Sequence, residues 1–171
     1  TADGIVKING NIKLVNPTIK NAFLASGTIL KTNANTDIVG KITIVNNTIH
    51  TNATVDTKLV EFTNNLTIND IKYENNVGNN HKLLDISAGT IVIATDTVIK
   101  NNKLVDSVIN IQGGARLRIN EGITLNINGN SGYQKPTSVE NCSGIKINGS
   151  GVLDIKGILL ADGNFDGAVV S

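Results

Sequence analysis

The chain of 171 residues contains no tryptophan and no methionine, and aromatic residues make up only 3% of it. It has two prolines and a single cysteine, Cys142. One cysteine excludes an intramolecular disulfide framework and a cysteine-based metal cluster. Because aromatic side chains are so scarce, a folded core has to be built from isoleucine, valine and leucine. The β-branched members of this set favour pleated strands.

The chain also lacks an excess of charge and a long apolar run. Its formal net charge is +1 at pH 7, whereas a dedicated nucleic-acid-binding domain presents a strongly basic face. No stretch approaches the run of about 18 apolar residues that a membrane-spanning helix needs. The composition therefore predicts no nucleic-acid partner and no membrane insertion.

Asparagine and glycine are abundant, and short aliphatic runs lie between them. Both residue types tolerate left-handed backbone and favour turns. Many short runs rich in isoleucine and valine, separated by turn-forming residues, predict an all-β fold made of short strands. The length predicts a single domain that spans residues 1–171.

A repeat of about 25 residues organises the chain. Residues 58–62 (KLVEF) recur as residues 82–86 (KLLDI), as residues 107–111 (SVINI) and as residues 144–147 (GIKI). Residues 168–171 resemble the beginning of a further copy. A period of this length is typical of solenoids, in which each repeat is one coil.

Two further aliphatic runs follow the first one in each repeat. In the second run, two aliphatic residues flank a residue that is usually polar, so alternation places the outer pair inside and the middle residue in solvent. We assign to the second run residues 12–14, 42–44, 66–68, 91–93, 117–119 and 153–155. A third run, usually closed by asparagine, includes residues 19, 49, 71–73, 98–99, 123–125 and 158–160.

Three short strands per repeat predict how the repeats pack. Stacked repeats pair each strand with its equivalents about 4.8 Å above and below, so that aliphatic residues form columns inside. Equivalent asparagines can then form hydrogen-bonded ladders at the corners. The sequence therefore predicts a right-handed parallel β-helix of about six coils, in which residues 22–40 and 128–143 break the period. The alternative is a β-sandwich, whose hairpin-connected strands would not repeat in threes.

Two stretches carry a resemblance at the level of the fold, residues 66–76 (LTINDIKYENN) and 116–127 (RLRINEGITLNI). They resemble coils of right-handed parallel β-helix surface proteins, namely adhesins, autotransporter passengers and pectate-lyase-like proteins. The resemblance implies a secreted or cell-surface location and a role in adhesion or glycan contact. The chain begins at Thr1 without a methionine, as a processed or excised segment does.

From these observations we expect an extracellular structural or adhesive protein that mediates attachment or fibre assembly, and not an enzyme. Its partners would be a surface receptor, a glycan, or neighbouring copies stacked end to end, because open solenoid ends expose unpaired backbone. The chain would then be either a segment of a longer solenoid or a self-assembling subunit. The alternative function is a polysaccharide lyase or hydrolase of the same fold, which needs a cluster of acids and bases on one face. No such cluster stands out, so we predict no catalytic residue, no metal and no cofactor.

Two groups of residues are candidates for binding. Glu61 and Asp85 occupy equivalent outward positions on adjacent coils, so their carboxyl groups would lie about 5 Å apart and could act as a pair or bind calcium. A solvated face with scattered charge is the alternative. Tyr133, Gln134 and Lys135 lie on an inserted loop, where an exposed ring beside polar groups suits a sugar or a protein surface. A tyrosine folded back against the solenoid is the alternative.

Leu59, Leu83 and Val108 are expected to point outward beside these acids. Together they would form an apolar stripe along the solenoid, and an exposed apolar patch can mark an interface. The alternative is that loops at residues 50–57 and 77–81 cover the stripe.

Overall fold

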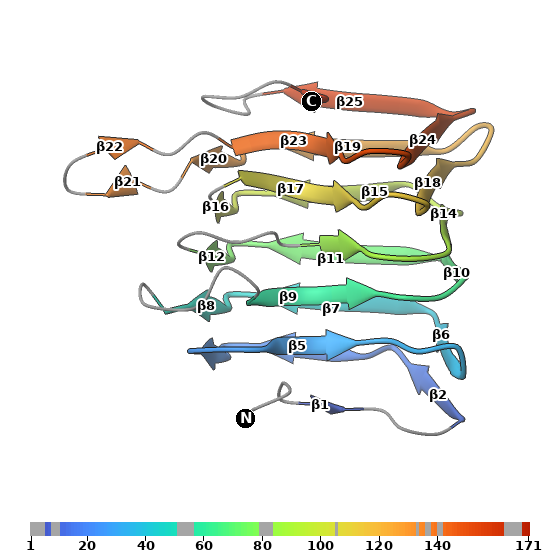
Figure 1. The fold of residues 1–171 in the computed structure, drawn as a ribbon, viewed down its shortest axis with the longest axis horizontal. Helices are drawn as coiled ribbons and strands as arrows, with labels where there is room; N and C mark the ends of the chain where they lie inside the picture. Colours follow the sequence, from blue (N-terminus) through green and yellow to red (C-terminus); the bar gives the residue numbers. More distant parts are fainter. Residues whose placement is uncertain are drawn as a thin grey trace.

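The computed structural model describes residues 6–7, 11–50, 57–78, 84–104, 106–132, 134–135, 138–139, 142–162 and 169–171. Throughout these ranges the regular structure consists of strands, without a helix. The strands wind into coils that lie one on top of another, from β1 near the N-terminus to β25 near the C-terminus (Figure 1). The all-β parallel solenoid that the repeat predicts is thus confirmed.

The first main sheet contains six parallel strands, one from each successive coil. They are β1 (Val6–Lys7), β5 (Thr28–Lys31), β9 (Lys58–Phe62), β13 (Leu84–Ile86), β17 (Asp106–Ile111) and β23 (Cys142–Ile147). The register is the one that the repeat predicts, because Leu84 pairs with Val60 in the coil below and with Ile109 in the coil above. A bridge between Ile145 and Val170 places the last described residues over β23, as expected for a further copy.

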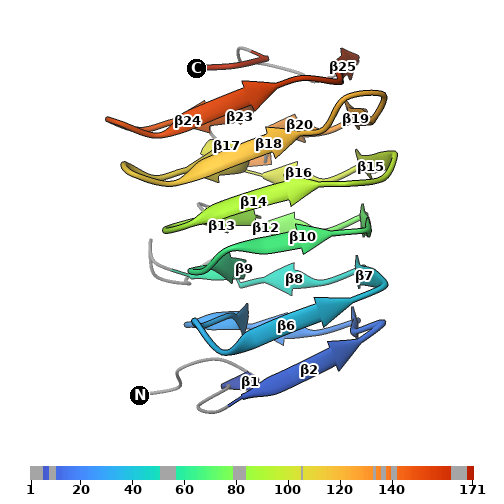
Figure 2. The same ribbon diagram turned by 90° about the vertical axis from the view of Figure 1, so that its right-hand side faces the viewer.

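The other two main sheets complete the coils. The second has four strands, β10 (Leu66–Ile68), β14 (Thr90–Ile93), β18 (Arg116–Ile119) and β24 (Val152–Ile155). The third has six strands, β3 (Thr18–Lys20), β7 (Lys41–Val45), β11 (Asp70–Glu74), β15 (Thr97–Lys100), β19 (Thr124–Asn128) and β25 (Ile158–Asp162). Below the second sheet lies a separate pair, β2 (Ile12–Val15) and β6 (Thr36–Val39), so that six strands rise in line in Figure 2.

The assignment of residues 42–44 to the second run is wrong. Their strand, β7, belongs to the third sheet, where Ile44 pairs with Tyr73. Ile44 therefore does not share a column with Ile68 and Ile93, which do pair with each other in the second sheet. The second position of this coil is taken instead by β6, inside the first interruption of the repeat. The aliphatic–polar–aliphatic pattern looks the same on every face of a solenoid, so alternation could not distinguish the two sheets.

The solenoid has about four complete turns, fewer than the six coils expected, although the first sheet has strands at six successive levels. In the described part of the chain, all three main sheets run together only from β9 to β25. Between β6 and β10 side chains bridge the two coils where no strand pairing is found. The N–H of Thr63 donates to Thr32 Oγ1 at 3.1 Å, and Asn64 Nδ2 donates to the carbonyl of Thr36 at 3.0 Å. The first coils are thus attached to the others without continuing the second sheet.

A fourth, very short strand follows the third sheet in successive coils, so the expectation of three strands per coil is also corrected. These strands form a five-stranded parallel sheet made of β4 (Phe23–Leu24), β8 (Thr48–Ile49), β12 (Val77–Gly78), β16 (Lys103–Leu104) and β20 (Ser131–Gly132). Residue 49 belongs here and not to the third run. Two residues are too few to show an alternation, so no sequence period marks these strands.

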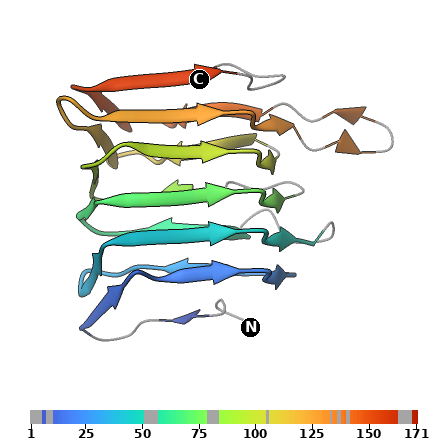
Figure 3. The same cartoon turned by 180° about the vertical axis from the view of Figure 1, so that it is seen from behind.

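The pairing within all these sheets is parallel, which excludes the β-sandwich that we considered as an alternative. The one antiparallel pair among the described strands joins β21 (Gln134–Lys135) to β22 (Ser138–Val139). This hairpin lies in the second interruption of the repeat. It projects sideways from the stack of coils, at the left in Figure 1 and at the right in Figure 3.

Aliphatic side chains fill the interior of the solenoid in columns. Ile68, Ile93 and Ile119 are stacked in the second sheet and are almost completely buried. Burial of one such side chain contributes about 1.5–3 kcal/mol relative to leaving it exposed. Tyr73 occupies a column of the third sheet, between Ile44 and Ile99, although its neighbours there are aliphatic. No single coil could bury these residues alone, so the stability of each coil depends on its neighbours.

The predicted asparagine ladder is present at the corner between the third sheet and the short strands. Asn47 Nδ2 donates to Asn76 Oδ1 at 2.9 Å, and Asn76 Nδ2 donates to Asn102 Oδ1 at 3.0 Å. Asn102 Nδ2 in turn donates to Asn130 Oδ1 at 2.8 Å. Each acceptor oxygen also receives the backbone N–H of the ladder residue below it. The four side chains are buried, so these bonds satisfy polar groups that water does not reach.

The residue before each rung of the ladder has a left-handed backbone. The φ angles are 55° at Asn46, 56° at Asn75, 56° at Asn101 and 57° at Gly129. Asparagine and glycine are the residues that tolerate this conformation at least cost. The paired asparagines of the sequence thus have two separate functions, the first in turning the chain and the second in binding the next coil.

Candidate functional site

The outward side of the first sheet carries a buried cluster of charged and amide side chains. Val60 and Phe62 of β9 lie in the core, so alternation places Glu61 on the outer side of the strand. Asp85 is its direct partner on β13, and Asn110 follows on β17. Although they face outward, all three are buried, and Asp85 is 0% exposed. We use the name outer cluster for Lys31, Lys58, Glu61, Asp85, Ser87, Asn110 and Gln112.

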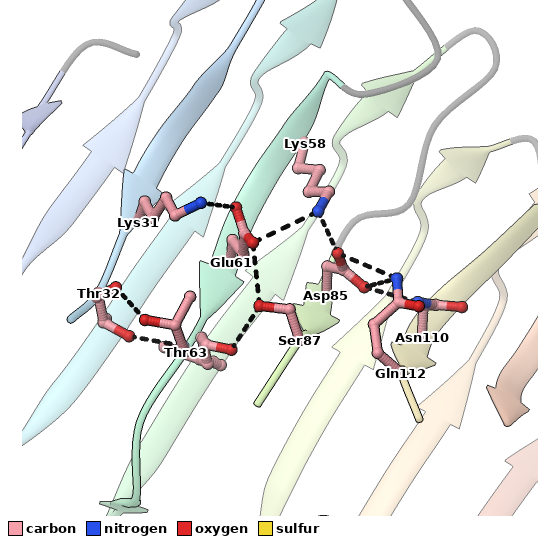
Figure 4. Close-up of polar contacts among 10 residues, drawn as sticks. Lys31, Thr32, Lys58, Glu61, Thr63, Asp85, Ser87, Asn110 and Gln112 are labelled. Carbon is pink, nitrogen blue, oxygen red and sulfur yellow. Dashed lines mark hydrogen bonds and ion pairs between the residues drawn. The ribbon is translucent and has the colours of Figure 1, made fainter. Parts of the chain in front are cut away.

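Lys58 lies between the two carboxylates of the outer cluster (Figure 4). Its ammonium group contacts Asp85 Oδ2 and lies 3.5 Å from Glu61 Oε1. Glu61 is further bound by Lys31 Nζ at 3.0 Å and by Ser87 Oγ at 2.9 Å. Burial acts to lower the pKa of Lys58, but its hydrogen bonds and charge interactions with Asp85 and Glu61 outweigh burial and raise this pKa above its ordinary value. The resting state of the site is therefore an ammonium ion between two carboxylates.

Amide groups complete the surroundings of Asp85. Its Oδ1 accepts a hydrogen bond from Asn110 Nδ2 at 2.6 Å and another from Gln112 Nε2 at 3.0 Å, while Oδ2 faces Lys58. Asn110 Oδ1 in turn accepts a hydrogen bond from Asn148 Nδ2 at 2.6 Å. The chain of polar contacts thus joins five successive coils, from β5 to the turn after β23.

The structure places Glu61 and Asp85 side by side, as equivalent positions require. It does not place them on a solvated face, because both are buried. The position where a calcium ion would have to lie between them is taken by the ammonium group of Lys58. In the described part of the chain, no three metal-binding side chains come together.

The expectation of an exposed apolar stripe is wrong for the residues that can be checked. Leu59 and Val108 are both buried, and Leu83 lies outside the described residues. Leu59 belongs to the same buried hydrophobic core as Val60 and Phe62. The alternation of the sequence predicts that Leu59 and Val108 are exposed, but both are buried. The sequence period alone could not reveal this burial.

The loop candidates can be followed only in part. Gln134 and Lys135 form β21 of the projecting hairpin. Tyr133 lies outside the described residues. The predicted departure of this segment from the regular stack is therefore observed in the backbone, whereas the contacts of the three side chains are not described.

A groove of about 380 Å³ crosses the outer side of the third sheet, where sequence reasoning placed no site. Its lining comes from β7, β11, β15 and the turn before β15, and consists of Lys41, Asp70, Ile71, Lys72, Glu74, Asp96, Val98 and Lys100. Lys41 binds Asp70 at 2.7 Å, and Glu74 lies 3.6 Å from Lys72 and 3.5 Å from Lys100. The three lysines are close to half exposed. Ion pairs this exposed contribute little to stability, so a ligand could compete for them.

A smaller charged group lies on the second sheet. Arg118 Nε donates to Asp154 Oδ2 at 2.8 Å, and Arg116 lies 3.4 Å from the same oxygen. The hydrogen bond from Arg118, with the nearby positive charges, lowers the pKa of Asp154 below its ordinary value. Because these side chains are partly exposed, this group is a surface ion pair that joins two adjacent coils.

No family model matches the chain, and comparisons with curated proteins and with solved structures found no match. The described residues contain no helix that is long and apolar enough to cross a membrane. Function therefore has to be inferred from the structure itself. Its features are a parallel β-solenoid with a projecting hairpin, a buried outer cluster on the first sheet and a charged groove on the third.

Proposed function

We propose that this chain is the rod of a secreted or cell-surface adhesive protein of the β-helix kind, and that it displays the β21–β22 hairpin to a partner. The observation that carries the proposal is the hairpin itself. It is antiparallel in a molecule of parallel sheets, and it projects between β20 and β23 without interrupting the stack of coils (Figure 1). Insertions in solenoids lie on one face and often form the binding surface.

The solenoid suits the task of holding such an element at a fixed place. Backbone pairing, the asparagine ladder and the outer cluster all join each coil to the next. A structure stabilised in this way behaves as a quasi-one-dimensional rod. The hairpin therefore has a rigid base, and its position along the rod is set by the coils beneath it.

The chemistry of the hairpin favours a glycan or a protein receptor. Gln134 and Lys135 of β21 supply an amide and a positive charge, and Tyr133 with its aromatic ring precedes them in the sequence. An aromatic ring with neighbouring donors suits stacking on a sugar and hydrogen bonding to its hydroxyl groups.

A binding experiment with matched variants tests this proposal. Tyr133, Gln134 and Lys135 are replaced together by alanine, and the chain is applied to a glycan array and to cell-surface extracts. We expect binding to fall by about tenfold or more with thermal stability unchanged. The control replaces Lys41, Lys72 and Lys100 by alanine, which changes the groove and leaves the hairpin intact. Loss of binding in the control alone would assign recognition to the third sheet and contradict the proposal.

A polysaccharide-active enzyme is the second candidate, and the groove on the third sheet is the observation that favours it. Asp70, Glu74 and Asp96 lie there beside three lysines, which is the combination of acids and cations that cleavage of an acidic glycan uses. The test is turnover of pectin, alginate and host glycans, followed by chromatography of the products. New reducing or unsaturated ends that disappear in the Asp96→Asn variant would support this activity, and intact polymers would contradict it.

Fibre assembly is a further use of the same rod. Ile12 in β2 and Ile155 in β24 face the interior, yet they are 38% and 45% exposed because no described strand lies beyond them. A further coil, from the same chain or from a neighbouring copy, would cover them. Sedimentation velocity over a wide concentration range distinguishes the two sources. Growing assemblies would support stacking of copies, and a monomer at every concentration would contradict it.

A further inference from the structure

We propose that Lys58 and Asp85 become joined by an intramolecular amide bond between Lys58 Nζ and Asp85 Cγ. The two residues lie on β9 and β13, so the bond would tie adjacent coils together covalently. Three features meet at this place. The amine contacts a carboxyl group, a second carboxyl group from Glu61 lies 3.5 Å from the amine, and two amide donors hold the other oxygen of Asp85 (Figure 4).

The site is dry and the reacting groups are held together. Asp85 is 0% exposed, and the side chains of Lys58 and Glu61 are 17% and 10% exposed. Groups fixed in contact react as if at effective concentrations of about 10⁵ M or more. Exclusion of water favours condensation over hydrolysis. The same exclusion protects the amide once it has formed.

The reaction begins with a proton transfer. In the resting ion pair the nitrogen has no free electron pair, so one proton has to move from Lys58 Nζ to Asp85 Oδ2. Glu61 Oε1 can relay this proton as a general base and acid. The product is a neutral amine beside a neutral carboxylic acid, the form in which the two groups can react.

The nitrogen then attacks Asp85 Cγ, and negative charge develops on Oδ1. Asn110 Nδ2 and Gln112 Nε2 already donate to this oxygen at 2.6 and 3.0 Å, as the donors of an oxyanion hole do. The Cγ–Oδ2 bond breaks, and Glu61 carries a second proton from the nitrogen to the leaving oxygen. One ammonium and one carboxylate thus give one amide and one water, with no oxidant and no cofactor.

The raised pKa of Lys58 makes the neutral amine scarce, so the reaction is expected to be slow. It needs to occur only once in the life of each molecule, however, and a dry site prevents its reversal. Slow formation is therefore compatible with complete conversion over hours to days. The bond would then resist forces that pull adjacent coils apart.

The chain contains a matched pair of groups that should not react. Lys146 Nζ lies 2.5 Å from Asp106 Oδ1, also between adjacent coils. These side chains are 38% and 27% exposed, and among the described residues no second carboxyl group and no pair of amide donors contacts this ion pair. In both pairs the lysine ammonium group contacts the aspartate carboxyl group. The two pairs differ in their exposure to solvent and in the groups around them.

Intact-mass spectrometry tests the proposal directly. The folded chain is incubated for several days at neutral pH, denatured and weighed. We expect a mass lower than that of the sequence by one water molecule, and a peptide map in which Lys58 and Asp85 are joined while Lys146 is free. A chain with the full sequence mass would overturn the proposal.

Two variants assign the residues. Lys58→Arg keeps the positive charge but cannot form this amide, and it is expected to retain the full mass. Glu61→Gln lacks the proton relay, and its folded form, verified by circular dichroism, is expected to link at least about tenfold more slowly. Loss of water in Lys58→Arg, or linkage of Glu61→Gln at the original rate, would contradict the mechanism.

Discussion

At the scale of the residue, the hydroxyl group of Tyr73 is the poorest fit in the core. The side chain is fully buried, and its oxygen has no hydrogen-bond partner in the part of the chain that the structure describes. Burial raises the pKa of Tyr73 well above its ordinary value, so the group stays neutral. A buried hydroxyl group without a partner lowers the free energy of unfolding, because it loses its hydrogen bonds to water. Phenylalanine has no hydroxyl group and avoids this cost.

We therefore expect Tyr73→Phe to raise the free energy of unfolding by about 1 kcal/mol. Chemical denaturation measures this change. A control at the neighbouring column position, Ile44→Val, is expected to lower stability by about 1 kcal/mol through loss of one methylene group. A destabilised Tyr73→Phe chain would show that the hydroxyl has a partner in solution.

Cys142 predicts how stability changes at high pH. Burial, with a smaller effect of the Asp106 charge, raises the pKa of its thiol to about 12, from an ordinary value of 9.0. Between these values the unfolded chain releases the thiol proton while the folded chain keeps it. The contribution of this group is therefore complete below pH 9.0 and is lost as pH rises toward about 12.

The Cys142→Ala variant tests this linkage. Its free energy of unfolding is expected to fall less steeply than that of the original chain across the same alkaline range. Denaturation curves at several pH values give the two slopes. Identical slopes for the two chains would contradict a buried thiol at this position.

At the scale of the element, the asparagine ladder is the device that joins the corners. The Asn76 side chain accepts hydrogen bonds from both nitrogens of Asn47, and its amide nitrogen donates to Asn102 and to the carbonyl of Ile44. Asn76→Ala would leave several of these buried groups without a partner. We expect a loss of about 3 kcal/mol.

Thermal and chemical unfolding measure this loss against a control on the outside of the same coil. Thr67 is exposed in the middle of β10, and Thr67→Ala should change stability by less than about 0.5 kcal/mol. If the two variants lose the same small amount, the ladder is not a principal source of cohesion between coils.

Two glycines with similar positive φ angles allow the cost of backbone strain to be distinguished from the cost of a steric clash between coils. Gly89 and Gly122 have φ angles of 76° and 73°, so alanine is strained at both. A Cβ at Gly89 would lie 2.6 Å from the backbone of Asn64 in the coil below, whereas a Cβ at Gly122 would meet open space. Gly122→Ala should cost about 1 kcal/mol, and Gly89→Ala clearly more. Equal costs, measured by denaturation, would indicate that the coils are not this close.

Much of the order of the strands can be predicted, because the sequence segments that form the first sheet are similar to one another and recur about every 25 residues. For this reason the repeat predicts correctly that Leu84 pairs with Ile109. It does not predict the strand β6, because Thr36–Val39 lies where the period breaks, and the two-residue strands carry no period at all. The pairing of Glu61 with Asp85 follows from the repeat, whereas their burial does not, because it depends on segments far apart in the sequence.

At the scale of the whole molecule, every cohesive feature acts between one coil and its neighbours. The sheet registers, the ladder and the outer cluster follow this rule. The stability of such a solenoid is a sum over adjacent coils, and damage to one coil weakens a boundary inside the rod. The predicted amide bond would strengthen one such boundary, between β9 and β13.

The central claim is that adjacent coils lie in parallel register, and disulfide formation between introduced cysteines tests it most directly. Thr67 and Val92 are direct partners on the outer side of β10 and β14, while Arg118 lies one coil further, about 10 Å from Thr67. In a Cys142→Ala background, Thr67→Cys with Val92→Cys should form a disulfide rapidly on mild oxidation of the folded chain. Thr67→Cys with Arg118→Cys should remain reduced. Failure of the first pair, or equal linkage of both, would contradict the stacked-coil structure.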